Sequence, residues 1–256
     1  MKLTFLGTGT SVGVPMIGCR CAVCTSADPR NRRRRSSVQV CADGKSLIVD
    51  TPPDFREQVL AHGVERVDAV LFTHSHADHV FGFDDIRRFN TLQRASIPVY
   101  GSPETVADLR RVFNYVGAAT TPGDYRPRAE FREVTGPFAL GALDIAPLTV
   151  EHGRKHTVGY LFRHAGRSLG YIPDCSRIPA AAMRALRGVD IMVLDALRFH
   201  PHGTHLTVEQ SLACLAQIGA GRSFLTHLAH DVEYAALQAE LPPGMFLAYD
   251  GLALEW

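Results

Sequence analysis

The sequence has no long hydrophobic run, because no segment approaches the roughly 20 consecutive apolar residues of a membrane-spanning helix. It also lacks an excess of charge of one sign: 27 basic side chains balance 26 acidic ones and leave a net charge of +1. That balance excludes a protein that coats a polyanion with most of its surface. The N-terminal stretch Met1–Leu6 holds one lysine and only a brief apolar run. We therefore predict a soluble, cytoplasmic protein without membrane contact.

Internal repeats and low-complexity segments are absent too, so the sequence does not indicate a repeat protein. What is present is the composition of an ordinary globular enzyme: 256 residues, of which 46% are hydrophobic and 21% are charged. A chain of this size can bury a large core. We predict a single domain that covers residues 1–256.

Short β-type runs alternate with helical runs along the chain, a pattern typical of an α/β sandwich. The least regular stretch, Gly117–Arg128, contains Pro122, Gly123 and Pro127 and predicts a surface loop. The predicted strands are Lys2–Leu6, Ser37–Cys41, Ser46–Asp50, Val67–Phe72, Ile97–Tyr100, Leu143–Val150, Gly159–Phe162, Ser168–Ile172, Ile191–Leu194, Ser223–Thr226 and Phe246–Tyr249. The predicted helices are Phe55–Ala61, Asp84–Gln93, Pro103–Val112, Pro179–Leu186, Val208–Ile218 and Val232–Glu240.

The densest group of metal-ligating side chains is His74–His79, with the sequence HSHADH, directly after the apolar stretch Val67–Thr73. A strand that ends in a loop presents the first two histidines on one side, and a turn through Ala77 brings Asp78 and His79 toward a neighbouring point. Two adjacent metals can then share one short loop. Imidazole and carboxylate ligands suit Zn²⁺, Mn²⁺ or Fe and favour an open catalytic site. Solvated loop histidines are the alternative.

Three further candidate ligands, His152, Asp174 and His227, each follow a predicted strand closely. Strand ends cluster at one rim of an α/β fold, so we expect these side chains to join the His74–His79 segment. A single residue of this kind is more often a surface histidine or a helix-capping aspartate. Three of them beside the HSHADH motif favour a metal centre.

The HxHxDH pattern of His74–His79, with Asp50 in LIVDTPPD and then His152, Asp174 and His227 in order, resembles the metallo-β-lactamase fold superfamily over nearly the whole chain. The resemblance implies a four-layer αββα sandwich and a hydrolase with two active-site metals. It also implies that Asp50 orients the ligand loop through hydrogen bonds. The implied ligands are His74, His76 and His152 for one metal, Asp78, His79 and His227 for the other, and Asp174 as the bridge between them.

Three thiols, Cys19, Cys21 and Cys24, lie within six residues, and the later segment THLAH offers a second histidine, His230. Three cysteines with His230 would make a closed tetrahedral zinc site, which is structural chemistry and not catalytic. Such a site would tie an N-terminal loop to the rim beside the active centre. Free buried thiols and a disulfide are the alternatives, and a disulfide is disfavoured in a cytosolic chain whose other cysteines are scattered.

The combination of CxCxxC, HxHxDH and THxxH is similar to the PhnP-type phosphodiesterases, whose namesake opens ribosyl 1,2-cyclic phosphates in phosphonate breakdown. This resemblance implies two divalent metals (Zn or Mn) in the active site and one separate structural Zn. It also implies that the substrates are small phosphodiesters, such as cyclic ribose or nucleotide phosphates. Many members act outside phosphonate pathways, so the resemblance indicates the reaction type and not the physiological substrate.

Catalysis at such a site would use the metal pair to lower the pKa of a bridging water and to hold the phosphodiester oxygens, with Asp78 catalytic as a ligand. The leaving oxygen still needs a proton, and His200, His202 and His205 are candidates. The Thr-His-Leu-Thr context of His205 resembles the family's second histidine motif, which implies that His205 is a phosphate-facing general acid. We interpret His200 and His202 as parts of a polar loop.

The run Arg30–Arg35 is the one strongly basic patch. Two interpretations stay open: a solvated loop, or arginines of which one reaches a phosphate or a nucleic-acid backbone. No aromatic residue interleaves with the run, which weakens a stacking platform for single strands. The glycine-rich segment Gly7–Gly13 lacks the G-x-G-x-x-G spacing of a dinucleotide-binding loop and predicts a tight turn.

Two alternatives to hydrolysis of small phosphodiesters stand beside it. One is another reaction on the same scaffold, either tRNA 3′-end processing or thioester hydrolysis; the long substrate-clamping arm expected of the tRNA enzymes is absent. The other is a non-catalytic metal- or nucleotide-binding module. A small phosphodiester is the expected partner and nucleic acid is not favoured. Apolar residues in Val106–Val116 leave a homodimer interface or a core helix open.

Overall fold

The computed structural model describes residues 1–117 and 125–256, so residues 118–124 of the predicted loop Gly117–Arg128 lie outside the described residues. Two seven-stranded sheets form the centre of the described part, in the orders β14-β1-β2-β3-β4-β5-β6 and β13-β12-β11-β10-β9-β8-β7. The first sheet comprises β1 (Lys2–Gly7), β2 (Ser37–Ala42), β3 (Lys45–Val49), β4 (Ala69–Leu71), β5 (Ile97–Gly101), β6 (Ala129–Glu133) and β14 (Ala253–Glu255). The second comprises β7 (Phe138–Leu140), β8 (Leu143–His152), β9 (Lys155–His164), β10 (Arg167–Ile172), β11 (Ile191–Asp195), β12 (Arg222–Thr226) and β13 (Met245–Leu247).

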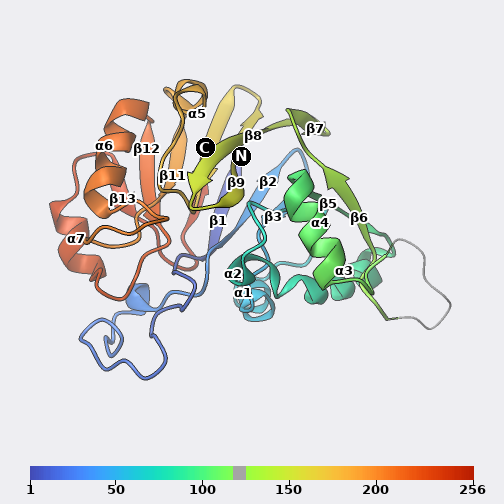
Figure 1. The fold of residues 1–256 in the computed structure, drawn as a ribbon, viewed down its shortest axis with the longest axis horizontal. Coiled ribbons are helices and arrows are strands. Elements are labelled where there is room, and N and C mark those ends of the chain that lie inside the picture. The colour runs from blue at the N-terminus through green and yellow to red at the C-terminus, as the bar shows by residue number, and fades with distance from the viewer. Residues whose placement is uncertain (118–124) are drawn as a thin grey trace.

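Helices flank the two sheets on their outer sides (Figure 1). Those that follow strands of the first sheet are α1 (Phe55–Ala61), α2 (Ala77–Val80), α3 (Ile86–Gln93) and α4 (Pro103–Val112). Those of the second sheet are α5 (Ala180–Leu186), α6 (Val208–Ile218) and α7 (Tyr234–Glu240). Short 3₁₀ turns occur at Pro29–Asn31 and Phe83–Asp85, the latter replacing the first turn of the predicted helix Asp84–Gln93. The predicted four-layer αββα sandwich is confirmed.

Three apolar clusters fill the spaces between these layers. They form because successive side chains of one strand point alternately to its two faces. In β11, Ile191 and Val193 belong to the central cluster between the sheets, whereas Met192 and Leu194 belong to the cluster shared with α5, α6 and α7. Successive side chains of a strand point to opposite faces, so a strand covered on both sides is apolar throughout. A third cluster packs the other sheet against α1, α3 and α4.

Three strands, β6, β7 and β14, were not predicted from the sequence. All three lie at sheet edges, and most of their side chains are exposed or half-buried. An edge strand buries little, so its hydrophobic pattern is weak. The segment Val106–Val116 has both buried and exposed apolar side chains: Val106 and Leu109 lie in the core, while Val112 and Tyr115 are exposed.

The strand ends at one rim carry the polar side chains that matter for function. Asp50 follows β3 and His74 lies shortly after β4, two parallel neighbours in the first sheet. Asp174 lies just beyond β10, Asp195 ends β11, and His227 follows β12, in three parallel neighbours of the second sheet. Ends of parallel strands meet at the same edge, so both sheets deliver side chains to one place. Within residues 1–117 and 125–256, no helix has the length and apolar character to cross a membrane.

Candidate active site

His74, His76 and His152 bring three imidazole rings to one point at this rim. His74 Nε2 lies 2.9 Å from His76 Nδ1, and His152 Nε2 lies 3.2 Å from the same atom. His152 Nδ1 faces the carbonyl oxygen of Thr204 at 2.8 Å. If Nδ1–H donates there, Nε2 keeps its lone pair for a cation. The structure thus brings together the three side chains that the sequence assigns to one metal.

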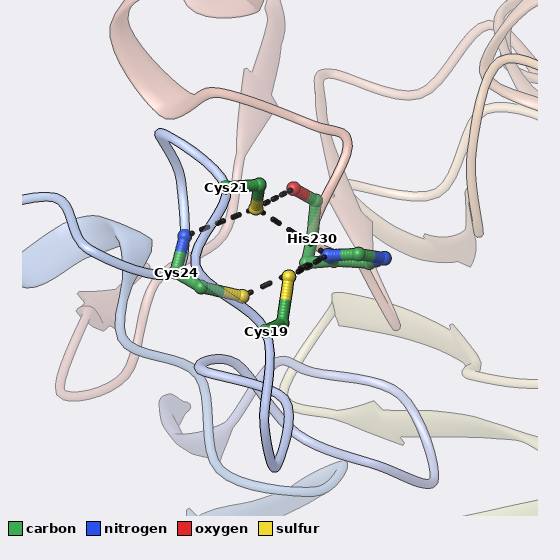
Figure 2. A group of neighbouring side chains, drawn as sticks. All are labelled: Cys19, Cys21, Cys24 and His230. Atoms are coloured by element: carbon green, nitrogen blue, oxygen red, sulfur yellow. Dashed lines mark hydrogen bonds between the residues drawn. The ribbon is translucent and has the colours of Figure 1, made fainter.

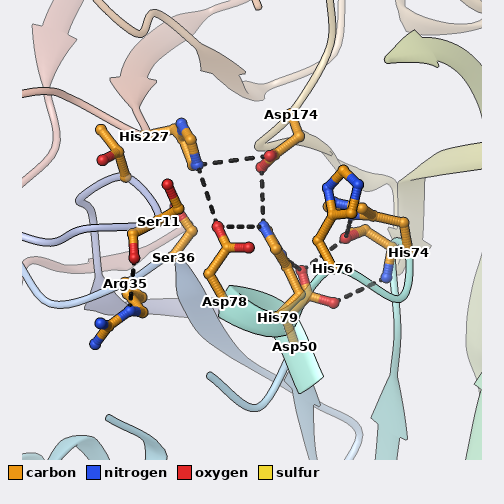
Figure 3. Close-up of polar contacts among 12 residues, drawn as sticks. Ser11, Arg35, Ser36, Asp50, His74, His76, Asp78, His79, Asp174 and His227 are labelled. Carbon is orange, nitrogen blue, oxygen red and sulfur yellow. Dashed lines mark hydrogen bonds and ion pairs between the residues drawn. The ribbon is translucent and has the colours of Figure 1, made fainter. Parts of the chain in front are cut away.

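Asp78, His79, Asp174 and His227 form a second group beside the first (Figure 3). His79 Nε2 lies 3.4 Å from Asp78 Oδ2 and 3.4 Å from Asp174 Oδ1. His227 Nε2 lies 3.9 Å from Asp78 Oδ2 and 3.5 Å from Asp174 Oδ2. Asp174 Oδ2 is also 3.9 Å from His152 Nε2 of the first group. Asp174 therefore lies between the two groups, where the predicted bridge would be.

These side chains fit cations better than they fit one another. His79 Nε2, His227 Nε2 and Asp174 Oδ1 are buried without a hydrogen-bond partner among the described residues. Two ligands about 2.0–2.1 Å from a tetrahedral ion lie roughly 3.3 Å apart, close to the 3.4 Å between His79 Nε2 and either carboxylate. An unpaired buried polar atom costs about 1–3 kcal/mol, and a coordinated cation would remove that cost. The mixed nitrogen and oxygen donors match Zn²⁺ or Mn²⁺.

The charges in the cluster favour the metal-binding forms of several ligands. Burial opposes ionisation of Asp174, yet His227 and His79 outweigh it and hold the pKa of this carboxyl well below its usual range. Burial also opposes ionisation of Asp78, and His79 and His227 again lower its pKa overall. Burial, reinforced by His79, lowers the pKa of His74 well below 6.5. At neutral pH the cluster therefore offers carboxylates and a neutral imidazole, the forms that bind metal.

The pKa of His79 shifts in the opposite direction to that of His74, so positive charge is favoured at this ring. Burial lowers the pKa of this ring, but Asp174, Asp78 and Asp50 together raise it well above 6.5. Three carboxylates around one buried ring call for a cation at this position. A bound metal ion would supply that charge and leave His79 neutral.

Two buried carboxylates at strand ends orient histidines of this site, one from each sheet. Asp50 Oδ2 accepts a hydrogen bond from His79 Nδ1 at 2.8 Å, and Asp50 adopts a left-handed backbone with φ of 63°. Asp195 Oδ2 faces His205 Nδ1 at the same distance, 2.8 Å. The sequence predicted an orienting role for Asp50 but we overlooked Asp195. A signal was present, because Asp195 ends MVLD as Asp50 ends LIVD.

His205 alone of the three candidate proton donors is placed at the cluster. Its Nε2 lies 4.0 Å from Asp174 Oδ2, and its ring stacks on that of His227 with centroids 4.7 Å apart. His202 is exposed, 5.2 Å from the His205 ring, and His200 is an exposed loop residue whose carbonyl accepts from Arg198. The interpretation of His200 and His202 as polar loop residues agrees with this placement. The Thr207–Gln210 capping box starts α6 directly after His205 and fixes the loop.

Asp108 on α4 ties two ligand-bearing segments together, a role that the sequence did not reveal. Its Oδ2 accepts from Ser75 Oγ and from Lys155 Nζ, both at 2.6 Å. Ser75 lies between two candidate ligands of the HSHADH motif, and Lys155 lies three residues after His152. Asp108 therefore holds these two segments at a set separation.

The three clustered cysteines and His230 meet in a separate group (Figure 2). His230 Nδ1 lies 3.3 Å from Cys19 Sγ, 3.5 Å from Cys21 Sγ and 3.7 Å from Cys24 Sγ. All three cysteines are free and half-buried, so neither a disulfide nor fully buried thiols describe them. The Cys24 backbone N–H, followed by His230, lowers the pKa of Cys21 to about 6, whereas burial raises that of Cys24 to about 11. The set fits a tetrahedral thiolate–imidazole zinc site.

Comparison with known proteins agrees with this geometry. The Beta-lactamase superfamily domain matches residues 45–228. A crystal structure of a diphosphatase from the PhnP family is 42% identical, with a TM-score of 0.91, and the match covers 100% of this chain and 97% of that one. A Zn²⁺-bound PqqB from Methylobacterium extorquens, 24% identical with a TM-score of 0.81 and full coverage of both chains, shares the fold.

Among curated relatives, an octanoyltransferase from Porphyromonas gingivalis is 35% identical over 260 residues, which is 98% of this chain. The chain spans only about half, 51%, of that relative's length. Coenzyme PQQ synthesis protein B from Methylorubrum populi is 26% identical over the full length of both proteins. With the matched domain, the site geometry and the similarity to a PhnP-family structure, the chain belongs to the metallo-β-lactamase superfamily of hydrolases and, within it, to the PhnP family.

Proposed function

We propose that this protein hydrolyses small phosphodiesters, with cyclic ribose or nucleotide phosphates as the substrate class. The observation that carries the proposal is the pairing of two adjacent cation-binding groups with a histidine, His205, whose Nε2 lies 4.0 Å from the shared Asp174. Two divalent cations held there would supply a nucleophilic oxygen at neutral pH and bind the non-bridging phosphate oxygens. His74, His76 and His152 would hold one cation, Asp78, His79 and His227 the other, and Asp174 both.

His205 is the residue proposed to give a proton to the leaving oxygen. Its Nδ1 is engaged by Asp195 at 2.8 Å, so proton exchange with a substrate takes place at Nε2. Burial, as the largest cause, lowers the pKa of His205 below 6.5, so the ring is mostly neutral at neutral pH and its protonated form, once present, is a stronger proton donor. Asp195, whose own pKa burial raises well above the usual range, keeps the ring turned toward Asp174.

A second candidate is hydrolysis of a phosphoanhydride in a diphosphate diester. The observation that favours it is the 42% identity and TM-score of 0.91 to a structure described as a PhnP-family diphosphatase. Both reactions displace an oxygen at phosphorus and need the same cations and proton donor. The activity named for the octanoyltransferase relative is not assigned to this chain, because this chain spans only 51% of that protein.

Metal content and turnover on defined substrates test the proposal. The purified protein is assayed for metals by mass spectrometry and for hydrolysis of bis(p-nitrophenyl) phosphate before chelation, after chelation and after return of Mn²⁺ or Zn²⁺. We expect about three metals per chain, two of them required for turnover. A comparison of 2′,3′-cyclic nucleotides, a diphosphate diester and a glutathione thioester then ranks the candidate reactions. Faster thioester turnover, or metal binding without turnover on any substrate, would overturn the proposal.

We also propose that the ligand is a small molecule and not a nucleic acid. The described residues present no long basic arm, and the net charge is only +1. A homodimer stays a prediction; light scattering on the metal-loaded protein tests it.

A further inference from the structure

The basic run Arg30–Arg35 is not a uniformly solvated loop. Arg30 is paired with Asp28 at 2.7 Å, and its guanidinium lies 4.3 Å from the centre of the Tyr234 ring. Arg33 is only 2% exposed. The four consecutive arginines 32–35 line one cavity of about 480 Å³. Its remaining lining residues are Gly13, Val14, Pro15, Pro29, Asp54 and Asp250.

Arg33 supplies a buried positive charge without a carboxylate partner. Its Nη1 donates to the carbonyl of Ala229 at 2.9 Å and its Nη2 to that of Val232 at 2.8 Å. Its Nε is buried and has no hydrogen-bond partner among the described residues. Burial lowers its pKa to about 10, so the guanidinium still carries its charge at neutral pH. Asp250, Glu233, Asp231 and Asp28 act on this guanidinium from a distance, but its hydrogen bonds go to uncharged oxygens, so Arg33 adds buried positive charge beside the cavity.

Arg32 and Arg34 are the arginines with free hydrogen-bonding capacity. Arg32 is exposed and has no ion pair in the described part of the chain, and Arg34 reaches Asp250 only at 3.9 Å. Arg35 differs, because its Nε donates to the Ser11 carbonyl at 2.8 Å and its Nη1 lies 2.9 Å from an Asp54 oxygen. Two guanidinium groups are thus left to bind an incoming anion.

The surroundings of Asp250, a carboxylate in the cavity lining, reduce its negative charge. Asp250 accepts hydrogen bonds from the backbone N–H groups of Thr8 and Arg34 at 2.9 and 2.8 Å. Burial raises its pKa to about 7, so much of its negative charge is lost near neutral pH. The cavity lining therefore contains four arginines, of which Arg32 and Arg34 have guanidinium groups left for an anion, together with one paired carboxylate, Asp54, and one partly neutral one, Asp250.

The cavity is a neighbour of the proposed catalytic centre but shares none of its ligands. Gly9 forms β-bridges with Arg35 on one side and with Leu228, next to His227, on the other. Neighbouring strands lie about 4.8 Å apart, so the Arg35 backbone is roughly 10 Å from that of Leu228. Figure 3 shows Arg35 and Ser11 on the side of the centre that carries Asp78 and His227. A Cβ at Gly9 would lie 2.8 Å from the Arg33 carbonyl oxygen, so only glycine fits between these segments.

We propose that this arginine cavity is a second anion site, which binds a phosphate group that is not the one being cleaved, with Arg32 and Arg34 as its contacting side chains. Guanidinium groups recognise phosphate through paired charged hydrogen bonds, and a pocket with no interleaved aromatic side chains suits a phosphate better than a stacked base. The phosphate belongs to a small ligand, either a second group of the substrate or a separate molecule. Phosphate binding at the cavity does not rest on the proposed cleavage reaction, whereas its assignment to a second group of the substrate does.

Calorimetric titration of inorganic phosphate into the metal-loaded protein tests the site at low ionic strength. We expect one binding event that persists in the Asp78→Ala variant, which disrupts the catalytic centre, and weakens at least about 10-fold in Arg32→Gln/Arg34→Gln. Arg30→Gln is the matched control, since it removes one arginine of the same run outside the cavity. Thermal melting checks the fold of each variant; if the double variant melts early, Arg32→Gln alone carries the test.

Two outcomes overturn the site: phosphate binding in the Asp78→Ala background that the added Arg32→Gln/Arg34→Gln pair leaves at full strength, or binding that vanishes in Asp78→Ala and therefore belongs to the catalytic centre alone. Kinetics then identify the source of the phosphate. A KM that rises in the double variant for a substrate with a second phosphate, while hydrolysis of bis(p-nitrophenyl) phosphate is unchanged, assigns the cavity to the substrate. Equal KM values with retained phosphate binding in the wild type assign it to a separate ligand.

Discussion

The molecule holds two clusters of metal-ligating side chains that differ in burial and in what holds them. His74, His79 and Asp174 are 0–2% exposed; His74 and Asp174 lie just after strands and His79 lies on α2, whereas the cysteines of the second cluster are half-buried on a loop without regular structure. Orienting carboxylates such as Asp50 fix the first cluster, while thiols and backbone N–H groups surround the second. A mixed donor set on rigid strands suits turnover, and a closed thiolate set suits a clasp for a loop.

The two clusters also share a segment of chain. His227 and His230 both follow β12, three residues apart, and His227 adopts a left-handed backbone with φ of 59°. Such a conformation in a residue other than glycine costs about 1–3 kcal/mol and persists only when its surroundings hold it. We infer that the cysteine cluster helps to hold the segment that carries His227. We therefore expect substitutions in the buried cluster to abolish turnover, and substitutions in the cysteine cluster mainly to lower stability.

The largest expected effect is that of Asp78→Ala. Removal of this carboxylate takes one ligand from the buried cluster, so nearly all turnover and one metal should be lost while the fold and the zinc proposed at the cysteine cluster should stay. The loss should exceed the roughly 10–100-fold effect of changing a residue that only orients a ligand. Turnover of bis(p-nitrophenyl) phosphate and metal mass spectrometry measure it. An active variant with full metal content would refute the ligand assignment.

His205→Ala should lower kcat by about 10²-fold or more for substrates with a poor leaving group, because it removes the proposed proton donor. Bis(p-nitrophenyl) phosphate should suffer much less, since p-nitrophenolate leaves without a proton. The exposed His202→Ala is the matched control and should change neither rate. Equal losses on both substrates, or loss of metal in His205→Ala, would contradict the role of proton donor.

Asp50→Asn should cost about 10–100-fold in metal affinity or turnover. The amide no longer offers two acceptor oxygens to Thr73 and His79, so the His79 ring loses its fixed orientation. Asp190→Asn is the control, because Asp190 also accepts hydrogen bonds, from Ser168, but lies at the start of β11, opposite the site. If the two variants bind metal equally well, Asp50 has no orienting role.

The smallest effect on catalysis is expected for Cys21→Ser. Loss of this thiolate should remove one zinc equivalent and lower Tm, by about 2–4 °C for each kcal/mol of stability lost in a domain of this size, with little change in kcat. Cys41→Ser serves as the control, since Cys41 lies on β2 outside the cluster. A large drop in kcat with zinc content unchanged would show that the cysteine cluster takes part in turnover and not in holding the loop.

Local patterns in the sequence were enough to identify both clusters. The HSHADH segment packs four ligating side chains into six residues, and CxCxxC packs three into six, so their members must lie close whatever the fold does. The interleaving of apolar strands such as β11 with helical runs likewise predicted an α/β sandwich, because a strand buried on both faces is apolar throughout; the four layers were implied by the resemblance to the metallo-β-lactamase fold superfamily. Edge strands such as β6 escaped prediction because they bury little.

The contacts between distant segments were decided only by the tertiary structure. Local spacing in the sequence does not show that Asp195 lies beside His205, or that Asp108 lies between Ser75 and Lys155. Nor does it show that Arg33 turns into the interior while Arg32 and Arg34 stay at a cavity. The sequence by itself determined which residue types carry the chemistry and that strand ends would present them. Which of them face one another was set by the packing of two sheets, because partners tens to hundreds of residues apart meet only when the layers are assembled.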